Sequence, residues 1–223
     1  METNVEMQRE TAKPSLFGML TSPGVQFERM RGKTPIAVPM IILIIIQAIM
    51  GAAVTYLTIR EQAPADVQVP LWVSTAFGVV AVVVGVIIAY FVIAALYKIL
   101  AMILGSDITY SKLLAITVYT SVISVVGGIA NTILMAVLGG TELKYTSLAP
   151  LFEKGTVLSS IASSFDIFAI WAYIAMALGL QIAGGFTKNK SIVFVVIVFV
   201  VTAAAAAGFT HLGSWLASLA PGA

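Results

Sequence analysis

Apolar residues fill long, uninterrupted stretches of the chain, and charged residues are confined to the segments between them. Five stretches contain no Asp, Glu, Lys or Arg: 34–59, 67–97, 113–141, 167–187 and 191–223. Even the shortest has 21 residues, and a helix needs about 20 apolar residues to cross a hydrocarbon core of ~30 Å. The pattern therefore predicts five membrane-spanning helices, at about 36–59, 71–97, 113–138, 164–185 and 192–212.

The composition indicates the same class of protein. Hydrophobic residues make up 60% of the chain, charged residues make up 10%, and the mean hydropathy is +1.03, which exceeds what a water-soluble globule can bury. We therefore predict an all-α membrane protein, a bundle of five transmembrane helices with an N-terminal interfacial amphipathic segment. Since the chain shows no internal repeat, we expect one domain over 15–215, a mobile cytosolic tail at 1–14 and a short extracellular tail at 216–223.

The amphipathic segment is predicted at 15–31, ahead of the first long apolar stretch. A Ser-Pro pair in its middle is typical of a helix N-cap followed by proline at the first helical position. Phe27 lies close in sequence to Arg29 and Arg31, so an aromatic ring can enter the acyl region while guanidinium groups reach lipid phosphates. We expect these three residues to contact the inner leaflet; a solvated linker remains the alternative.

The basic residues are distributed unevenly between the two sides that five crossings define. With the amino terminus inside, nine of the twelve lysines and arginines are cytoplasmic, and three, Arg60, Lys144 and Lys154, are outside. An excess of Lys and Arg in cytoplasmic segments determines orientation. We predict a multi-pass protein of the cell membrane with a cytoplasmic N-terminus and an extracellular C-terminus. We expect membrane lipid as a partner and no nucleic acid.

Asp166 stands at the beginning of the fourth predicted span. Ser163 and Asp166 match the Ser-x-x-Asp spacing of a capping box, in which the carboxylate satisfies free amides and meets the positive end of the helix near the outer headgroups. The alternative is an ionisable group within the membrane, which marks an ion path or a buried recognition site. We favour the cap and leave the functional site open.

Other polar side chains within the predicted spans are candidates for interhelical hydrogen bonds. Asn131 and Asp166 both lie toward the outer side and are candidate partners. Tyr90, Tyr119 and Gln181 fall in the inner halves of their helices and are candidates for a second group. Because such contacts between membrane helices contribute about 0.6 kcal/mol each, we favour structural roles for these residues.

The sequence lacks the residue patterns of common enzyme classes. It contains no cysteine and one histidine, His211, too few ligands of these types for a zinc site. Walker A, G-x-S-x-G and H-E-x-x-H patterns are absent. We therefore expect no catalytic residue, metal or cofactor. Five spans do not divide into the two equal repeats typical of carriers, but a small homo-oligomeric channel or carrier remains the alternative function.

Three segments resemble bacterial proteins of the Yip-domain family: SLFGMLTSPGVQFERMRGKTPIAVP at 15–39, the Gly105-Ser106 turn ahead of LLAITVYTS, and FDIFAIWAYIAMALGL at 165–180 followed by a basic turn. The resemblance covers about residues 15–208. Its fixed positions are Pro23, Phe27, Gly105, Tyr119, Asp166, Trp171 and Gly179. It implies five membrane helices, a cytosolic amino terminus and no catalytic residues.

The resemblance also implies a kind of function, because members of this family are thought to act as membrane adaptors. The polar leader is similar to that of a bacterial member associated with a MacAB-like ABC exporter that protects cells against a toxic peptide. This implies that the chain assists exporter assembly by binding the adaptor subunit or permease. Phe165, Trp171 and Trp215 are candidate contacts, since aromatic anchors dominate contact energies, or they are lipid-facing belt residues. The connection at 141–162, with a short helix at VLSSIAS, is the candidate docking surface, and small residues such as Gly179 are candidates for helix association.

Overall fold

A computed structural model describes residues 13–62, 70–140 and 144–218, and every regular element in these ranges is a helix. The only strand-like pairing in the described part of the chain is an isolated bridge between Ser147 and Asp166. The predicted tails at 1–14 and 216–223 lie largely outside the described ranges.

Four helices in the described ranges are long and apolar enough to cross a membrane. They are α4 (Ala37–Gln62), α5 (Leu71–Ile103), α6 (Tyr110–Leu138) and α9 (Lys188–Ser218). They confirm the first, second, third and fifth predicted spans, although each helix continues beyond its predicted span at one end or both. The predicted stop after the third span is also confirmed, since α6 ends at Leu138 and Gly139 forms its C-cap with φ of 76°.

The helix α8 (Ile167–Ile182) has only 16 residues, or about 24 Å at 1.5 Å per residue, less than the ~30 Å of a hydrocarbon core. A full-length fourth span at 164–185 is therefore not confirmed. The helix begins late because Asp166 caps it, and its last residue, Ile182, precedes a turn in which Gly185 has φ of 73°. This conformation favours glycine because it has no Cβ.

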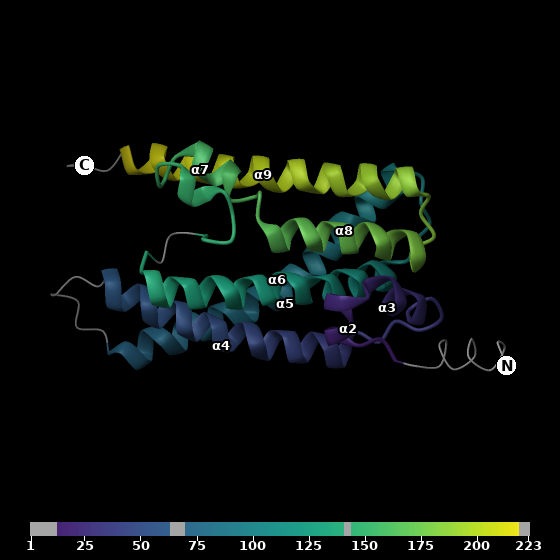
Figure 1. Ribbon diagram of the computed structural model, residues 1–223, viewed down its shortest axis with the longest axis horizontal. Coiled ribbons are helices and arrows are strands. Elements are labelled where there is room, and N and C mark those ends of the chain that lie inside the picture. Colours follow the sequence, from purple (N-terminus) through teal and green to yellow (C-terminus); the bar gives the residue numbers. More distant parts are fainter. Residues whose placement is uncertain (1–12, 63–69, 141–143, 219–223) are drawn as a thin grey trace.

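The long helices run side by side, with α6 in the centre (Figure 1). This helix packs against α4 and α5 on one side and against α8 on another, and α8 packs against α9. In its most apolar stretch 28% of the residues are buried, compared with 6% in α4. The core of the bundle therefore forms around α6.

The two ends of the bundle carry different short helices (Figure 1). At one end, α2 (Leu16–Thr21) and α3 (Pro23–Arg29) lie against α6 and α8. At the other end, α7 (Val157–Ala162) lies beside α9, and η1 (Ala149–Leu151) packs against α7. We refer to these as the α2–α3 end and the α7 end.

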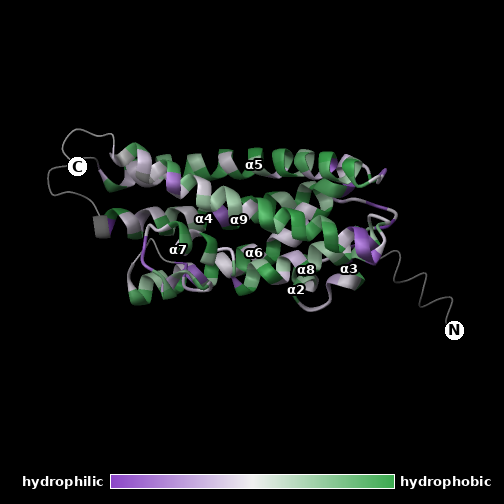
Figure 2. Ribbon diagram, turned by 90° about the horizontal axis from the view of Figure 1, so that it is seen from above, coloured by the Kyte–Doolittle hydropathy of each residue, from purple (hydrophilic) through white to green (hydrophobic). Residues whose placement is uncertain are grey.

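The exterior of the bundle is apolar. Figure 2 shows hydrophobic residues along the long helices and hydrophilic residues mainly toward the two ends. Ile49 on α4, Phe77 on α5 and Val137 on α6 are each at least 66% exposed. Large apolar side chains exposed along whole helices are expected where the surrounding solvent is lipid.

Residues 15–31 form the broken helix that the Ser-Pro pair predicts, with Ser22 as the N-cap of α3. The predicted lipid contact of Phe27 is wrong, because its ring is fully buried within the bundle. A Cβ atom on Gly179 of α8 would lie only 2.8 Å from the Phe27 ring. The arginines also bond within the protein: Arg29 donates to Gln26 Oε1 at 3.4 Å, and Arg31 Nε donates to the Ile182 carbonyl at 3.1 Å. The apolar face of this segment thus covers the end of the core.

Candidate functional sites

Asp166 joins the start of α8 to the connection that follows α6. Its Oδ1 atom accepts a hydrogen bond from the Ala169 amide at 2.8 Å, and its Oδ2 atom accepts one from the Thr146 hydroxyl. Lys144 Nζ lies 3.6 Å from Oδ2. The Asp166 side chain is buried, whereas that of Lys144 is 44% exposed. One carboxylate therefore caps a helix and holds two residues of a distant loop.

The predicted capping box is wrong in its details. Asp166 is itself the N-cap of α8, not the third helical residue, and Ser163 is the C-cap of α7. The reason is that α7 occupies residues up to Ala162, so that α8 starts only after a short link. The carboxylate still performs the capping that its position suggested, since an N-cap side chain accepts from the amide two or three residues later.

Asn131 holds the same connection from α6. Its Oδ1 atom accepts a hydrogen bond from the Tyr145 amide at 2.7 Å, and the Tyr145 hydroxyl donates to the carbonyl of Gly139. Asn131 and Asp166 thus bind neighbouring residues of one connection. Lys144, Tyr145 and Thr146 were not predicted as partners, although a lysine in the connection before an acidic cap was a usable signal.

The connection at 144–166 presents an apolar surface at the α7 end. We call this surface the α7 platform, and its exposed large side chains are Leu148, Leu151, Phe152, Val157, Leu158, Ile161 and Phe165. Leu151 is 76% exposed and Leu158 is 56% exposed. The predicted helix at VLSSIAS is present as α7. The Asp166 and Asn131 contacts hold the platform to the bundle.

The remaining predicted contact residues lie on separate elements. Phe165 packs edge-to-face on Phe199 of α9, with ring centroids 5.3 Å apart. Trp171 on α8 is 38% exposed, and Trp215 near the end of α9 is 53% exposed. Tyr119, by contrast, is fully buried in α6, so it belongs to the packing core and not to an accessible surface.

A cavity of about 360 Å³ lies among α4, α5, α6 and α8. Gln47 Nε2 donates to the Tyr90 hydroxyl at 3.2 Å, and that hydroxyl lies 2.8 Å from Ser121 Oγ. The predicted group of Tyr90, Tyr119 and Gln181 is wrong, because Gln181 bonds to the Ala177 carbonyl of its own helix. Tyr90 instead links three helices.

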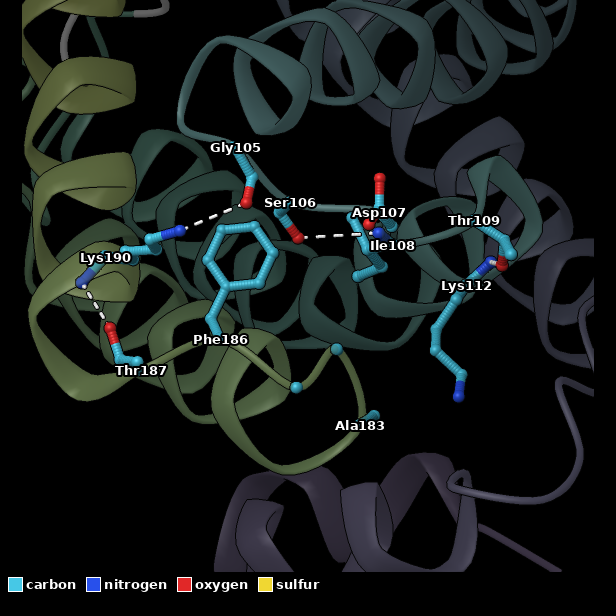
Figure 3. A pocket seen from close by; sticks show the side chains of 12 residues that line it. Gly105, Ser106, Asp107, Ile108, Thr109, Lys112, Ala183, Phe186, Thr187 and Lys190 are labelled. Carbon is cyan, nitrogen blue, oxygen red and sulfur yellow. Dashed lines mark hydrogen bonds between the residues drawn. The ribbon is translucent and has the colours of Figure 1, made fainter.

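A second cavity, of about 480 Å³, lies at the α2–α3 end between the turns at 105–109 and 183–187. Figure 3 shows Lys112 and Lys190 on opposite sides of it, with Phe186 between them. Lys190 Nζ donates to the Gly105 carbonyl at 3.1 Å, and Lys112 Nζ donates to the Arg31 carbonyl at 3.0 Å. This basic pocket was not predicted from the sequence, because its two turns are far apart in the chain.

The described residues offer no cluster of acidic or histidine side chains that could form a metal site. Within the described ranges, no group of three or more His, Cys, Asp or Glu is placed to hold a metal ion. The ion pair between Lys144 and Asp166 is the only one among the described residues. The main polar features in the described part of the bundle are the α7-end contacts, the central cavity and the basic pocket.

Comparison with known proteins assigns the whole helical region to one family. The Yip1 domain matches residues 17–209. The chain is 34% identical over 212 residues to the membrane protein YknW of Bacillus subtilis (strain 168). The aligned region covers 89% of this chain and 92% of the relative. No solved structure matches the chain.

Proposed function

Since the chain belongs to the Yip1-domain family of multi-pass membrane proteins, we propose that it is a non-enzymatic integral membrane adaptor that assists the assembly of a partner membrane complex. The partner we propose is a MacAB-like ABC exporter that protects the cell against a toxic peptide. In this proposal the protein binds either the adaptor subunit or the permease of that exporter. The resemblance of the polar leader with PSLFGMLTSPGVQFERM, which ends at residue 30, motivates this choice.

The topology we propose has five crossings in the cell membrane, with the N-terminus in the cytoplasm and the C-terminus outside. The helices α4, α5, α6, α8 and α9 run alternately between the two ends of the bundle (Figure 1), and this alternation supports counting α8 as a crossing despite its length. The excess of basic residues places the α2–α3 end in the cytoplasm. One domain over 15–215 is part of this proposal.

The observation that carries the adaptor function is the α7 platform. On an extracellular connection, seven large exposed apolar side chains are unfavourable in water, and such patches mark interaction sites. In the proposed topology the platform faces outward, and an extracellular domain of the exporter binds it. Gly51, Gly127 and Gly179 are not available for this role, because a Cβ at each would meet Val82, Phe168 and Phe27. Small residues at these positions serve packing within the bundle.

The platform is tested with Leu151→Ser combined with Leu158→Ser in the full-length protein expressed with the exporter. We expect at least a tenfold loss of co-purified exporter subunit, because truncating central apolar contacts costs about 1–2 kcal/mol or more each. The matched control is Ile45→Ser combined with Val84→Ser, which changes exposed residues of α4 and α5. Unchanged co-purification of the exporter subunit with the platform variant, or an equal loss with the control variant, contradicts the placement of the binding surface on the α7 platform.

The polar cavity among α4, α5, α6 and α8 favours the alternative function, a small homo-oligomeric channel or carrier. Hydroxyl and amide groups such as Tyr90, Ser121 and Gln47 line a cavity within the apolar part of the bundle, as transport pathways require. Ion flux through liposomes that contain only this protein supports the alternative, particularly if Ser121→Ala reduces it. Absence of flux together with exporter capture supports the adaptor.

A further inference from the structure

The basic pocket at the α2–α3 end lies among several cations that form no ion pair with another described residue. Four cations there donate to backbone carbonyls: Arg31 to Ile182, Lys98 to Ile108, Lys112 to Arg31 and Lys190 to Gly105. A carbonyl is neutral, and none of these cations forms an ion pair within the described part of the chain. The charge therefore remains available to an anion.

The two lysines that line the pocket also stand where helices disfavour them. Lys112 is the third residue of α6, Lys190 is the third residue of α9, and neither helix has an acidic residue in its first turn. The N-terminus of a helix is positive, so a cation in the first turn is locally destabilising. Positions that break a local rule are commonly functional, and the neutral carbonyls that these lysines contact do not offset their charge.

The shape of the pocket suits a compact anion at the level of lipid headgroups. The buried residues Ala183, Ile108 and Phe186 form an apolar floor, and the lysines flank it from opposite sides (Figure 3). An ammonium has three donors, so each lysine can keep its carbonyl bond and still donate to a ligand. The turns that line the pocket directly follow or precede α5, α6, α8 and α9, which places it at the boundary between hydrocarbon and water.

From these observations we propose that the basic pocket binds a phosphate group, that of an anionic phospholipid headgroup. The phosphate sits between Lys112 and Lys190 at the starts of α6 and α9, and the acyl chains follow the exposed faces of the neighbouring helices. A soluble phosphate ester shares this chemistry and is the competing source. The inference does not depend on the adaptor function, which concerns the opposite end of the bundle.

The test measures lipid binding to the full-length protein in uncharged detergent by native mass spectrometry. The probes are phosphatidylglycerol, phosphatidylcholine with the same acyl chains, and glycerol 3-phosphate without lipid. We expect phosphatidylglycerol to bind more tightly than phosphatidylcholine. Lys112→Gln combined with Lys190→Gln should weaken phosphatidylglycerol binding about thirtyfold, since each lysine near anionic lipid contributes roughly a fivefold factor. Glutamine keeps a donor for the carbonyl bonds, so the fold should persist, as the unfolding midpoint will show.

Two further variants separate this site from general attraction between charges. Asp107→Asn removes the carboxylate that lines the pocket and should strengthen phosphatidylglycerol binding severalfold. Arg60→Gln combined with Lys154→Gln removes the same charge as the double lysine variant but away from the pocket, and should leave binding unchanged. The proposal would be overturned if both double variants lost phosphatidylglycerol binding equally, or if the Lys112 and Lys190 variant lost none. Saturable glycerol 3-phosphate binding that the lysine variant abolishes supports the phosphate site with a soluble ligand as its source.

Discussion

At the residue scale, the stability of the start of α8 depends on whether the hydrogen bonds or the ion pair of Asp166 contribute more. The Lys144 side chain is 44% exposed, so solvent screens the ion pair and its contribution should be at most about 1 kcal/mol. The bonds from the Ala169 amide and the Thr146 hydroxyl reach a buried carboxylate, where an unmade bond is costly. Hydrogen bonding should therefore outweigh charge at this position.

Replacement of Asp166 tests this division. Asp166→Asn keeps a capping oxygen and an amide that can bond Thr146, so it should lower the free energy of unfolding by less than about 1 kcal/mol. Asp166→Ala removes the cap and the Thr146 acceptor and should lower it by roughly 2–3 kcal/mol. Unfolding in mixed micelles with increasing dodecyl sulfate, followed by tryptophan fluorescence, measures both. Equal losses in the two variants would mean that the charge dominates.

At the element scale, the helices are held together by close contacts at glycines. A Cβ on Gly78 of α5 would lie 2.5 Å from Thr55 Oγ1 of α4, and one on Gly127 of α6 would lie 2.6 Å from Phe168 Cβ of α8. Without a hydrophobic driving force between helices in lipid, small residues that permit close approach supply the packing energy. The same device fixes α3, because Phe27 occupies the space above Gly179.

Enlarging Gly179 should detach α3 from α8. Gly179→Val places side-chain atoms against the Phe27 ring and Ile116 Cγ2, and overpacking of this kind costs about 1–3 kcal/mol. We expect trypsin to cleave after Arg31 several times faster, because the α2–α3 segment leaves the core.

Two variants control this experiment. Gly208→Val changes a glycine of α9 whose Cβ would meet no atom within 4 Å, so cleavage after Arg31 should stay at the wild-type rate. Phe27→Ala combined with Gly179→Val should relieve the clash without restoring the packing, giving higher unfolding stability than Gly179→Val alone. If the double variant is less stable than either single variant, a clash between the Phe27 ring and a larger side chain at position 179 is not the cause of the destabilisation.

At the scale of the whole molecule, the arrangement of helices assigns the two ends of the bundle to opposite sides of the membrane. An odd number of crossings follows if α8 traverses the bilayer, with α7 at the end of the bundle where α8 begins (Figure 1). The platform and the basic pocket then face different compartments. This separation allows partner binding at one end and lipid binding at the other to be studied independently.

Topology can be measured directly, because the chain contains no cysteine. Leu151→Cys and Thr187→Cys place single thiols at the α7 end and in the basic pocket. In intact cells a membrane-impermeant maleimide should label only Leu151→Cys, and Thr187→Cys should react after permeabilisation. Gly32→Cys, near α3, should behave like Thr187→Cys. Labelling of both Leu151→Cys and Thr187→Cys in intact cells would refute the five-crossing arrangement.

Much of the fold could be predicted from residue type and spacing. Uncharged stretches located α4, α5, α6 and α9, because a membrane helix satisfies its own backbone and needs only length and apolarity. Glycines and a Ser-Pro pair marked where helices stop and start. The capping by Asp166 was also foreseeable, since the carboxylate acts within four residues of its own position.

The sites were less predictable, because their partners are distant in sequence. The basic pocket joins residues 105–109 to residues 183–187, and Tyr90 meets Gln47 and Ser121 from other helices. The burial of Phe27 depends on a glycine more than 150 positions away. Local sequence therefore determined which segments form the four long apolar helices. Only helix packing decided which side chains face lipid, one another or a cavity, since apolarity alone does not distinguish lipid from a protein core.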